Sequence, residues 1–181
     1  MEWKAYFLRQ LDYQLWANQV LFDALAHLEP EALSQPEGLF FGTIHHTVDH
    51  LLAVHELWTG RLRGDAPRTP RLDLQRIHHP DWHALKRALQ QALHAFRHWL
   101  EAQPLEFFSG RCHYTGLGGE PRQDGTADLL THLMHHFTHH RGQISAVATR
   151  LGAPAPEMDF LGFMRAMEGA AREIQAAQMQ Q

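Results

Sequence analysis

Residues 126–151 read TADLLTHLMHHFTHHRGQISAVATRL, and this stretch decides both the fold class and where a functional site is sought. Its apolar residues recur every three or four positions, which is the spacing of one face of an α-helix. Thr126 suits the N-cap, Asp128 the first turn, and Gly152 with Pro154 the end of such a helix. The pattern predicts a helix with one apolar stripe, formed by Leu129, Leu133, Phe137, Ile144, Val147 and Leu151.

The rest of the chain holds four more segments with helical spacing, separated by clusters of Pro and Gly. These predicted helices cover 3–28, 43–63, 82–100 and 159–174. Residues 64–80 contain three prolines and predict a long crossover, whereas 104–125 predict a loop or small hairpin around the β-like piece 111–115. We expect an all-α fold, a four-helix bundle with a long crossover and an additional C-terminal helix, in a single domain over 1–181.

Composition excludes several classes of protein. Lys and Arg total 16 against 20 Asp and Glu, a formal charge of −4, so no positive field attracts nucleic acid. The single Cys112 supports neither an internal disulfide nor sulfur ligation of a metal, which suits a reducing cytoplasm. Because we find neither a secretory leader nor a run of 18 apolar residues, we expect no export and no membrane span. The unusual feature of the composition is the number of histidines, 16 in a chain of 181 residues.

Five histidines lie in the 126–151 helix, and a rotation of 100° per residue sorts them by face. His136 lies about 40° from His140, so both share the apolar stripe, whereas His135 and His139 point about 140° and 100° away toward solvent. His132, about 80° away, is a boundary case. A single core histidine is usually a packed, hydrogen-bonded residue. Two at i and i+4 can instead place both Nε2 atoms on one ion, which offsets both desolvation costs.

A third ligand has to come from another helix, and the 43–63 helix offers four histidines: His45, His46, His50 and His55. His50 shares a face with Thr47, Val54 and Leu57, beside the main apolar stripe, and is the first choice. His55 also falls on that stripe and is the main competitor. For any one of these residues, a surface or packing role is the alternative.

These residues also resemble a known family. The segment 136–143 has the form H-x-x-x-H-R-G-Q of the DinB/YfiT-like superfamily of metal-dependent enzymes. Further similar segments are 49–58, with a His followed eight residues later by Trp, 13–18, with the form Y-x-x-W-A-N, and the turn at 151–160. The resemblance implies metal ligation by His50, His136 and His140. Arg141 and His55 are candidates for positions next to the ligands. Arg141, however, points about 100° from His140, so contact with another helix or a partner subunit is the alternative. At the position of His55, many relatives carry an acidic residue.

Three imidazoles leave at least one coordination position open, which is typical of a catalytic rather than a structural site. Such a site activates water or deprotonates a bound thiol. The resemblance implies the thiol, because characterised relatives use bacillithiol or mycothiol as a cosubstrate. The hypothesis is therefore an S-transferase-like enzyme acting on small electrophiles in detoxification or stress response. A metal-dependent hydrolase using activated water, and a non-enzymatic metal-binding stress protein, are the alternatives.

The three imidazoles do not determine which metal binds, because imidazole suits several ions. Zinc is the first expectation, and nickel or iron are further options. Gln143 lies one turn from His140 and is placed to orient a ligand, and Tyr13 and Asn18 are further candidates for contact with the site. Patterns for di-iron bundles, zincins, esterases and nucleotide binders do not occur in the sequence. We expect a small-molecule substrate, and the resemblance implies a homodimer packed through helices.

Overall fold

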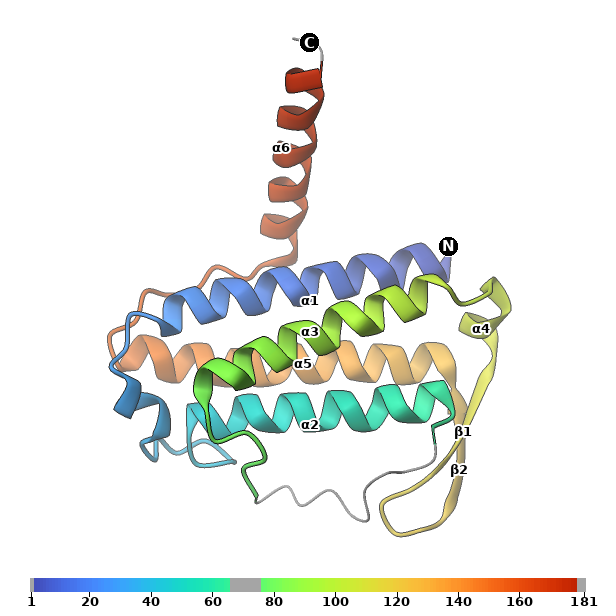
Figure 1. Ribbon diagram of the computed structural model, residues 1–181, viewed down its shortest axis with the longest axis horizontal. Coiled ribbons are helices and arrows are strands. Elements are labelled where there is room, and N and C mark those ends of the chain that lie inside the picture. Colours follow the sequence, from blue (N-terminus) through green and yellow to red (C-terminus); the bar gives the residue numbers. More distant parts are fainter. Residues whose placement is uncertain (1, 66–75, 179–181) are drawn as a thin grey trace.

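Four long helices lie side by side in the computed structural model, which describes residues 2–65 and 76–178 (Figure 1). They are α1 (Trp3–Leu25), α2 (Ile44–Arg63), α3 (Trp82–Glu101) and α5 (Thr126–Arg150). The predicted all-α bundle is confirmed, and each predicted helix is present. Within the described residues, none of the helices combines the length and the apolar character that crossing a bilayer requires.

The connections between these helices carry short elements. A 3-10 turn, η1 (Pro30–Ser34), lies between α1 and α2, and α4 (Leu105–Ser109) follows α3. The strands β1 (Arg111–Thr115) and β2 (Pro121–Gly125) then pair in antiparallel register, with Arg111 opposite Gly125, which confirms the predicted small hairpin. The predicted crossover at 64–80 lies partly outside the described residues, since 66–75 are not among them.

Local hydrogen bonds fix where the helices begin. The Thr43 side chain accepts from the backbone N–H of His46 at the start of α2, and the Asp81 side chain caps α3 in the same way. The prediction of Thr126 as an N-cap is wrong, because Gly125 is the N-cap and Thr126 is the first helical residue. The backbone N–H of Thr126 donates to the carbonyl of Gly110, the residue between α4 and β1, which the pairing of Arg111 with Gly125 brings close to the start of α5.

The core lies between the four long helices and is built from their apolar stripes. The stripe of α3 is the most regular, and every member is at most 1% exposed: Leu85, Leu89, Leu93, Phe96 and Leu100. Because α2 packs against both α3 and α5, one part of its surface faces each neighbour. This arrangement decides which histidines of α2 meet those of α5.

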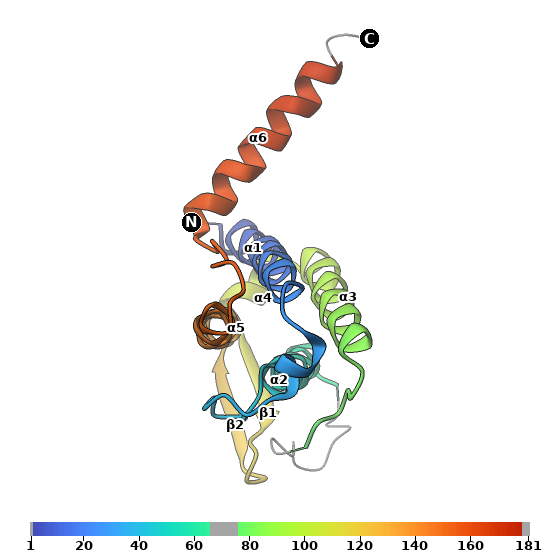
Figure 2. The same ribbon diagram turned by 90° about the vertical axis from the view of Figure 1, so that its left-hand side faces the viewer.

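The C-terminal helix α6 (Phe160–Gln178) does not lie along the bundle (Figures 1 and 2). It begins against α1 and then extends away from the other helices, with its far end well separated from them. The Tyr13 hydroxyl donates to the carbonyl of Met158, which fixes the segment just before α6 to α1. The predicted helix at 159–174 is therefore present, and it continues to Gln178.

Candidate metal centre

Three histidines from two helices converge at one point between α2 and α5. The ligand atoms of His50, His136 and His140 all lie within 4.8 Å of one another. The Nε2 atoms of His50 and His136 are 3.2 Å apart. Two nitrogens bound at ~2.0–2.1 Å to one tetrahedral ion would stand about 3.3 Å apart, so this spacing fits a shared ion. The residues present therefore suit a divalent metal.

Gln143 determines which nitrogen of His140 is available. The Nδ1 atom of His140 lies 2.8 Å from the Gln143 side-chain oxygen. Since an amide oxygen only accepts, Nδ1 carries the proton and donates, and the lone pair is left on Nε2. Hydrogen bonds of this kind orient metal-binding histidines in many sites. The structure thus gives Gln143 the orienting position that its spacing from His140 predicts.

The electrostatics of the cluster keep the imidazoles neutral. Burial lowers the pKa of His50 to about 4 and that of His136 to about 3, and the charge of neighbouring histidines lowers both further. Burial also lowers the pKa of His140. Neutral rings have free lone pairs at neutral pH, which is the state that metal binding requires. The 3.2 Å between the Nε2 atoms of His50 and His136 is also a hydrogen-bond distance, at which one neutral ring donates to the other.

Aromatic rings enclose the cluster. Phe41, in the turn before α2, stacks on His50 with ring centroids 3.9 Å apart and lies 5.7 Å from His140. One turn before His136 on α5, the His132 ring lies 6.1 Å from that of His136 and 5.2 Å from that of Trp58. The sequence pattern does not single out Phe41, because residues 35–43 have neither helical nor strand spacing.

Arg141, Tyr13 and Asn18 meet one another on the side of α5 that faces α1. The Arg141 guanidinium donates to the side-chain oxygens of Gln14 and Asn18 and lies 5.2 Å from the Tyr13 ring centroid. Arg141 is 1% exposed, and burial lowers its pKa. These side chains join α5 to α1, and none of their contacts within the described part of the chain is with the three histidines.

The competing ligand His55 is buried elsewhere. Its ring packs edge-on against Phe96 of α3, at 5.5 Å, and against Phe137 of α5, at 5.8 Å. Burial lowers its pKa to about 4, and its Nδ1 atom has no hydrogen-bond partner among the described residues. The structure therefore brings His50, and not His55, to the pair on α5.

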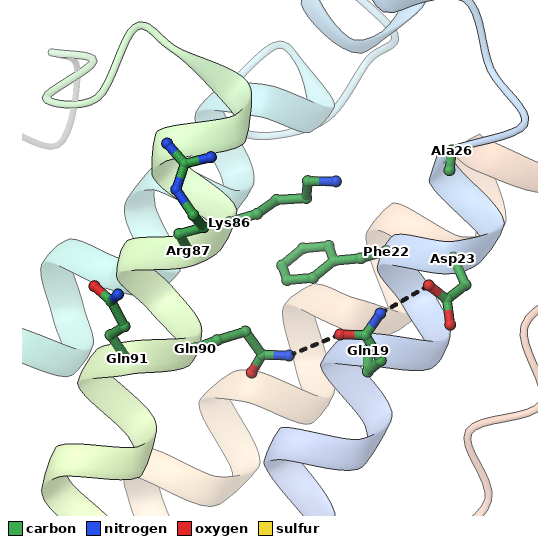
Figure 3. Close-up of a pocket in the computed structure, with 8 residues that line it drawn as sticks. All are labelled: Gln19, Phe22, Asp23, Ala26, Lys86, Arg87, Gln90 and Gln91. Carbon is green, nitrogen blue, oxygen red and sulfur yellow. Dashed lines mark hydrogen bonds between the residues drawn. The ribbon is translucent and has the colours of Figure 1, made fainter.

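An open groove lies apart from the histidines. It has a volume of about 360 Å³ and lies between α1 and α3, where Phe22 lies beside the hydrogen-bonded side chains of Gln90 and Gln19 (Figure 3). Its lining shares no residue with the histidine cluster. We assign the chemistry to the cluster, since convergent ligand atoms are more specific than the size of an open groove.

Fold and site together define a class: helical bundles in which imidazoles from two helices are placed to hold one metal ion. The family model described as the DinB family matches residues 1–176, and the chain belongs to this family. One similar protein, named Protein DinB, comes from Bacillus subtilis (strain 168). It is 23% identical over 153 residues, which cover 82% of this chain and 88% of that protein. The predicted membership in the family is confirmed.

Proposed function

We propose that the protein is a metal-dependent enzyme of the S-transferase type, which joins a low-molecular-weight thiol through its sulfur to small electrophiles. The observation that carries the proposal is the convergence of His50, His136 and His140 within 4.8 Å. Three protein ligands leave room for a further ligand, as in catalytic sites. Zinc is the first choice for three neutral imidazoles, and nickel or iron also suit them.

The residues of the chain perform three tasks in this proposal. His50, His136 and His140 would hold the ion, whose positive charge would favour the thiolate form of a bound thiol. Gln143 keeps the Nε2 lone pair of His140 directed at the ion, as its 2.8 Å contact with Nδ1 indicates. Phe41 covers His50 and limits access of water from that side. In the proposed reaction the thiol gives its proton to solvent, its sulfur forms a bond to the electrophilic carbon, and the leaving group departs as an anion with the electron pair of the broken bond.

Two further rings, next to His136, suit an organic substrate. His132 and Trp58 stand edge to face with centroids 5.2 Å apart, and His132 adjoins His136. Such surfaces pack against apolar or aromatic groups. The proposal places the protein in cytoplasmic detoxification or the stress response.

The first experiment is elemental analysis of protein purified without a nickel column. We expect one tightly bound ion per chain, lost in His140→Ala and retained in His139→Ala. His139 is a matched control because its ring lies 4.9 Å from that of His140, yet it is exposed on the same helix. Several weakly bound ions that persist in His140→Ala would instead support the alternative of a non-enzymatic metal-binding protein.

The second experiment measures turnover of a chromogenic electrophile with and without a low-molecular-weight thiol. Thiol-dependent turnover that disappears in His140→Ala and remains in His139→Ala supports the transferase. Thiol-independent hydrolysis with the same dependence on His140 supports the hydrolase. Absence of both activities in protein that holds one ion per chain would contradict the enzymatic proposal.

A further inference from the structure

A row of rings leads from the metal centre toward the β-hairpin, which lies beside the end of α2 (Figure 1). His132 is next to His136, with ring centroids 6.1 Å apart, and Trp58 is 5.2 Å from His132. Tyr114 of β1 continues the row, 5.4 Å from Trp58. His132 is exposed and the other three rings are half-buried, so a ligand from solvent can contact the whole row.

Arg61 stands at the far end of this row. Its guanidinium carbon lies over the Trp58 ring, 4.5 Å from the centroid, and over the Tyr114 ring, 4.7 Å from the centroid. One of its N–H groups donates to the carbonyl oxygen of Thr115 at 2.9 Å. Two rings and a backbone oxygen thus restrain a long side chain that otherwise loses much rotamer freedom on binding. A guanidinium restrained in advance is suited to recognise a ligand.

The charge of Arg61 has no carboxylate partner within the described residues. The carboxylates of the hairpin region have other partners, since Glu120 pairs with Arg122 at 2.9 Å and Asp124 accepts from the Tyr114 hydroxyl at 2.7 Å. Burial lowers the pKa of Arg61, yet a guanidinium stays charged in proteins. Most of its five N–H donors are left for an acceptor from outside the described chain.

The distance from Arg61 to the metal centre limits the size of a ligand that reaches both. Arg61 follows His50 by eleven residues on α2, a rise of about 16 Å. Its guanidinium lies over Trp58, three residues earlier, so the side chain points back toward His50 and shortens the gap to roughly 10–15 Å. A ligand that binds at both ends is therefore an extended molecule.

We propose that Arg61 binds a carboxylate at the far end of the thiol whose sulfur reaches the metal centre, with the middle of that thiol lying along His132 and Trp58. The inference rests on the proposed function and gives its thiol a chemical class, an extended molecule with a carboxylate remote from the sulfur. Paired N–H donors of a guanidinium match the two oxygens of a carboxylate, and a neutral carboxamide does not replace them. Arg61 determines specificity and takes no part in the bond-forming step.

Binding of thiol peptides to the cobalt-loaded protein tests the proposal without turnover. The probes are N-acetyl-cysteinyl-triglycine with a free C-terminal carboxylate and the same peptide with a C-terminal carboxamide; four extended residues span about 13 Å. A thiolate bound to Co²⁺ produces a charge-transfer absorption band, which yields the dissociation constant of each peptide. We expect the carboxylate peptide to bind wild type at least tenfold more tightly than the carboxamide, and the two to bind Arg61→Gln within twofold of each other.

Arg63→Gln is the matched control for loss of a positive charge. Arg63 lies on the same helix and also stands over two rings, those of Phe96 and Trp99, so its variant should keep the wild-type preference. Arg61→Lys keeps the charge without the paired donors, and its preference should fall at least threefold. N-acetyl-cysteine and its amide are too short to span the gap and should bind every variant within twofold of each other. Circular dichroism and cobalt content confirm that each variant is folded and loaded.

The outcomes separate this inference from the proposed function. Equal affinity of the two long peptides for wild type would overturn the role of Arg61 while the thiol function stands. So would a full preference in Arg61→Gln or Arg61→Lys, or an equal loss of preference in Arg63→Gln. If none of the peptides produces the charge-transfer band, the thiol does not reach the metal, and the proposed function fails together with this inference.

Discussion

His55 is expected to make the fold sensitive to acid. Its ring is 1% exposed between Phe96 and Phe137, and burial lowers its pKa from 6.5 to about 4. A hydrogen bond to the backbone of Ala92 acts in the opposite direction but is the smaller effect. At a pH between these two pKa values, His55 is protonated in the unfolded chain and neutral in the folded chain. Stability is therefore retained above pH 6.5 and falls as the pH drops toward 4.

The size of the effect follows from the same two values. For a single group with a pKa of 6.5 unfolded and about 4 folded, linkage predicts a loss of about 2 kcal/mol between pH 8 and pH 5. Substituting His55→Leu keeps an apolar side chain between the two rings and removes the titrating group. The variant should therefore lose about 2 kcal/mol less than the wild type over this interval.

Urea unfolding at pH 8 and pH 5, in the presence of a chelator, measures how much free energy of unfolding the wild type and His55→Leu each lose between the two pH values. The chelator keeps metal from adding its own pH dependence. His94→Leu is the control, since His94 is exposed on α3 and its environment changes little on unfolding. If the wild type and His55→Leu lose equal stability between the two pH values, the burial argument is refuted.

Three further predictions concern the metal centre, the core and the loop before α3. Gln143→Ala should weaken metal binding by about 10–100-fold in a competition assay with a fluorescent chelator, whereas Gln143→Glu, which keeps the acceptor, should not. Leu93→Ala should lower the free energy of unfolding by about 2–5 kcal/mol in urea, because Leu93 is fully buried in the core. Asp49 is 1% exposed and accepts from the backbone N–H and the Nδ1 of His79, each at 2.9 Å. Asp49→Asn should cost about 1–3 kcal/mol and speed amide hydrogen exchange at residue 79.

Apolar periodicity was sufficient to predict the helices and the i, i+4 pair on α5. Helical spacing depends only on local geometry, so the relation between His136 and His140 was fixed before any packing was known. The spacing of Gln143 from His140, one turn of the same helix, was likewise fixed by local geometry, and its side-chain oxygen accepts a hydrogen bond from the Nδ1 of His140. The N-cap was less predictable, because the bond from Thr126 to Gly110 depends on the hairpin.

The sequence favoured His50 over His55 as the third ligand, and the tertiary structure shows which of the two reaches the pair on α5. His50 and His55 differ by about 140° around α2, so they face different neighbours, and only the rotation of α2 in the bundle decides which one meets α5. The structure directs His50 to the histidine pair and His55 toward Phe96 of α3.

The sequence by itself determined the class of fold, the positions of the helices and the two imidazoles of α5, because each depends on spacing along one helix. Only the tertiary structure decided that Arg141 is buried against Gln14 and Asn18, that Phe41 covers His50, and that α6 leaves the bundle. These contacts join residues far apart in the chain, and no local periodicity encodes how helices rotate and pack against one another.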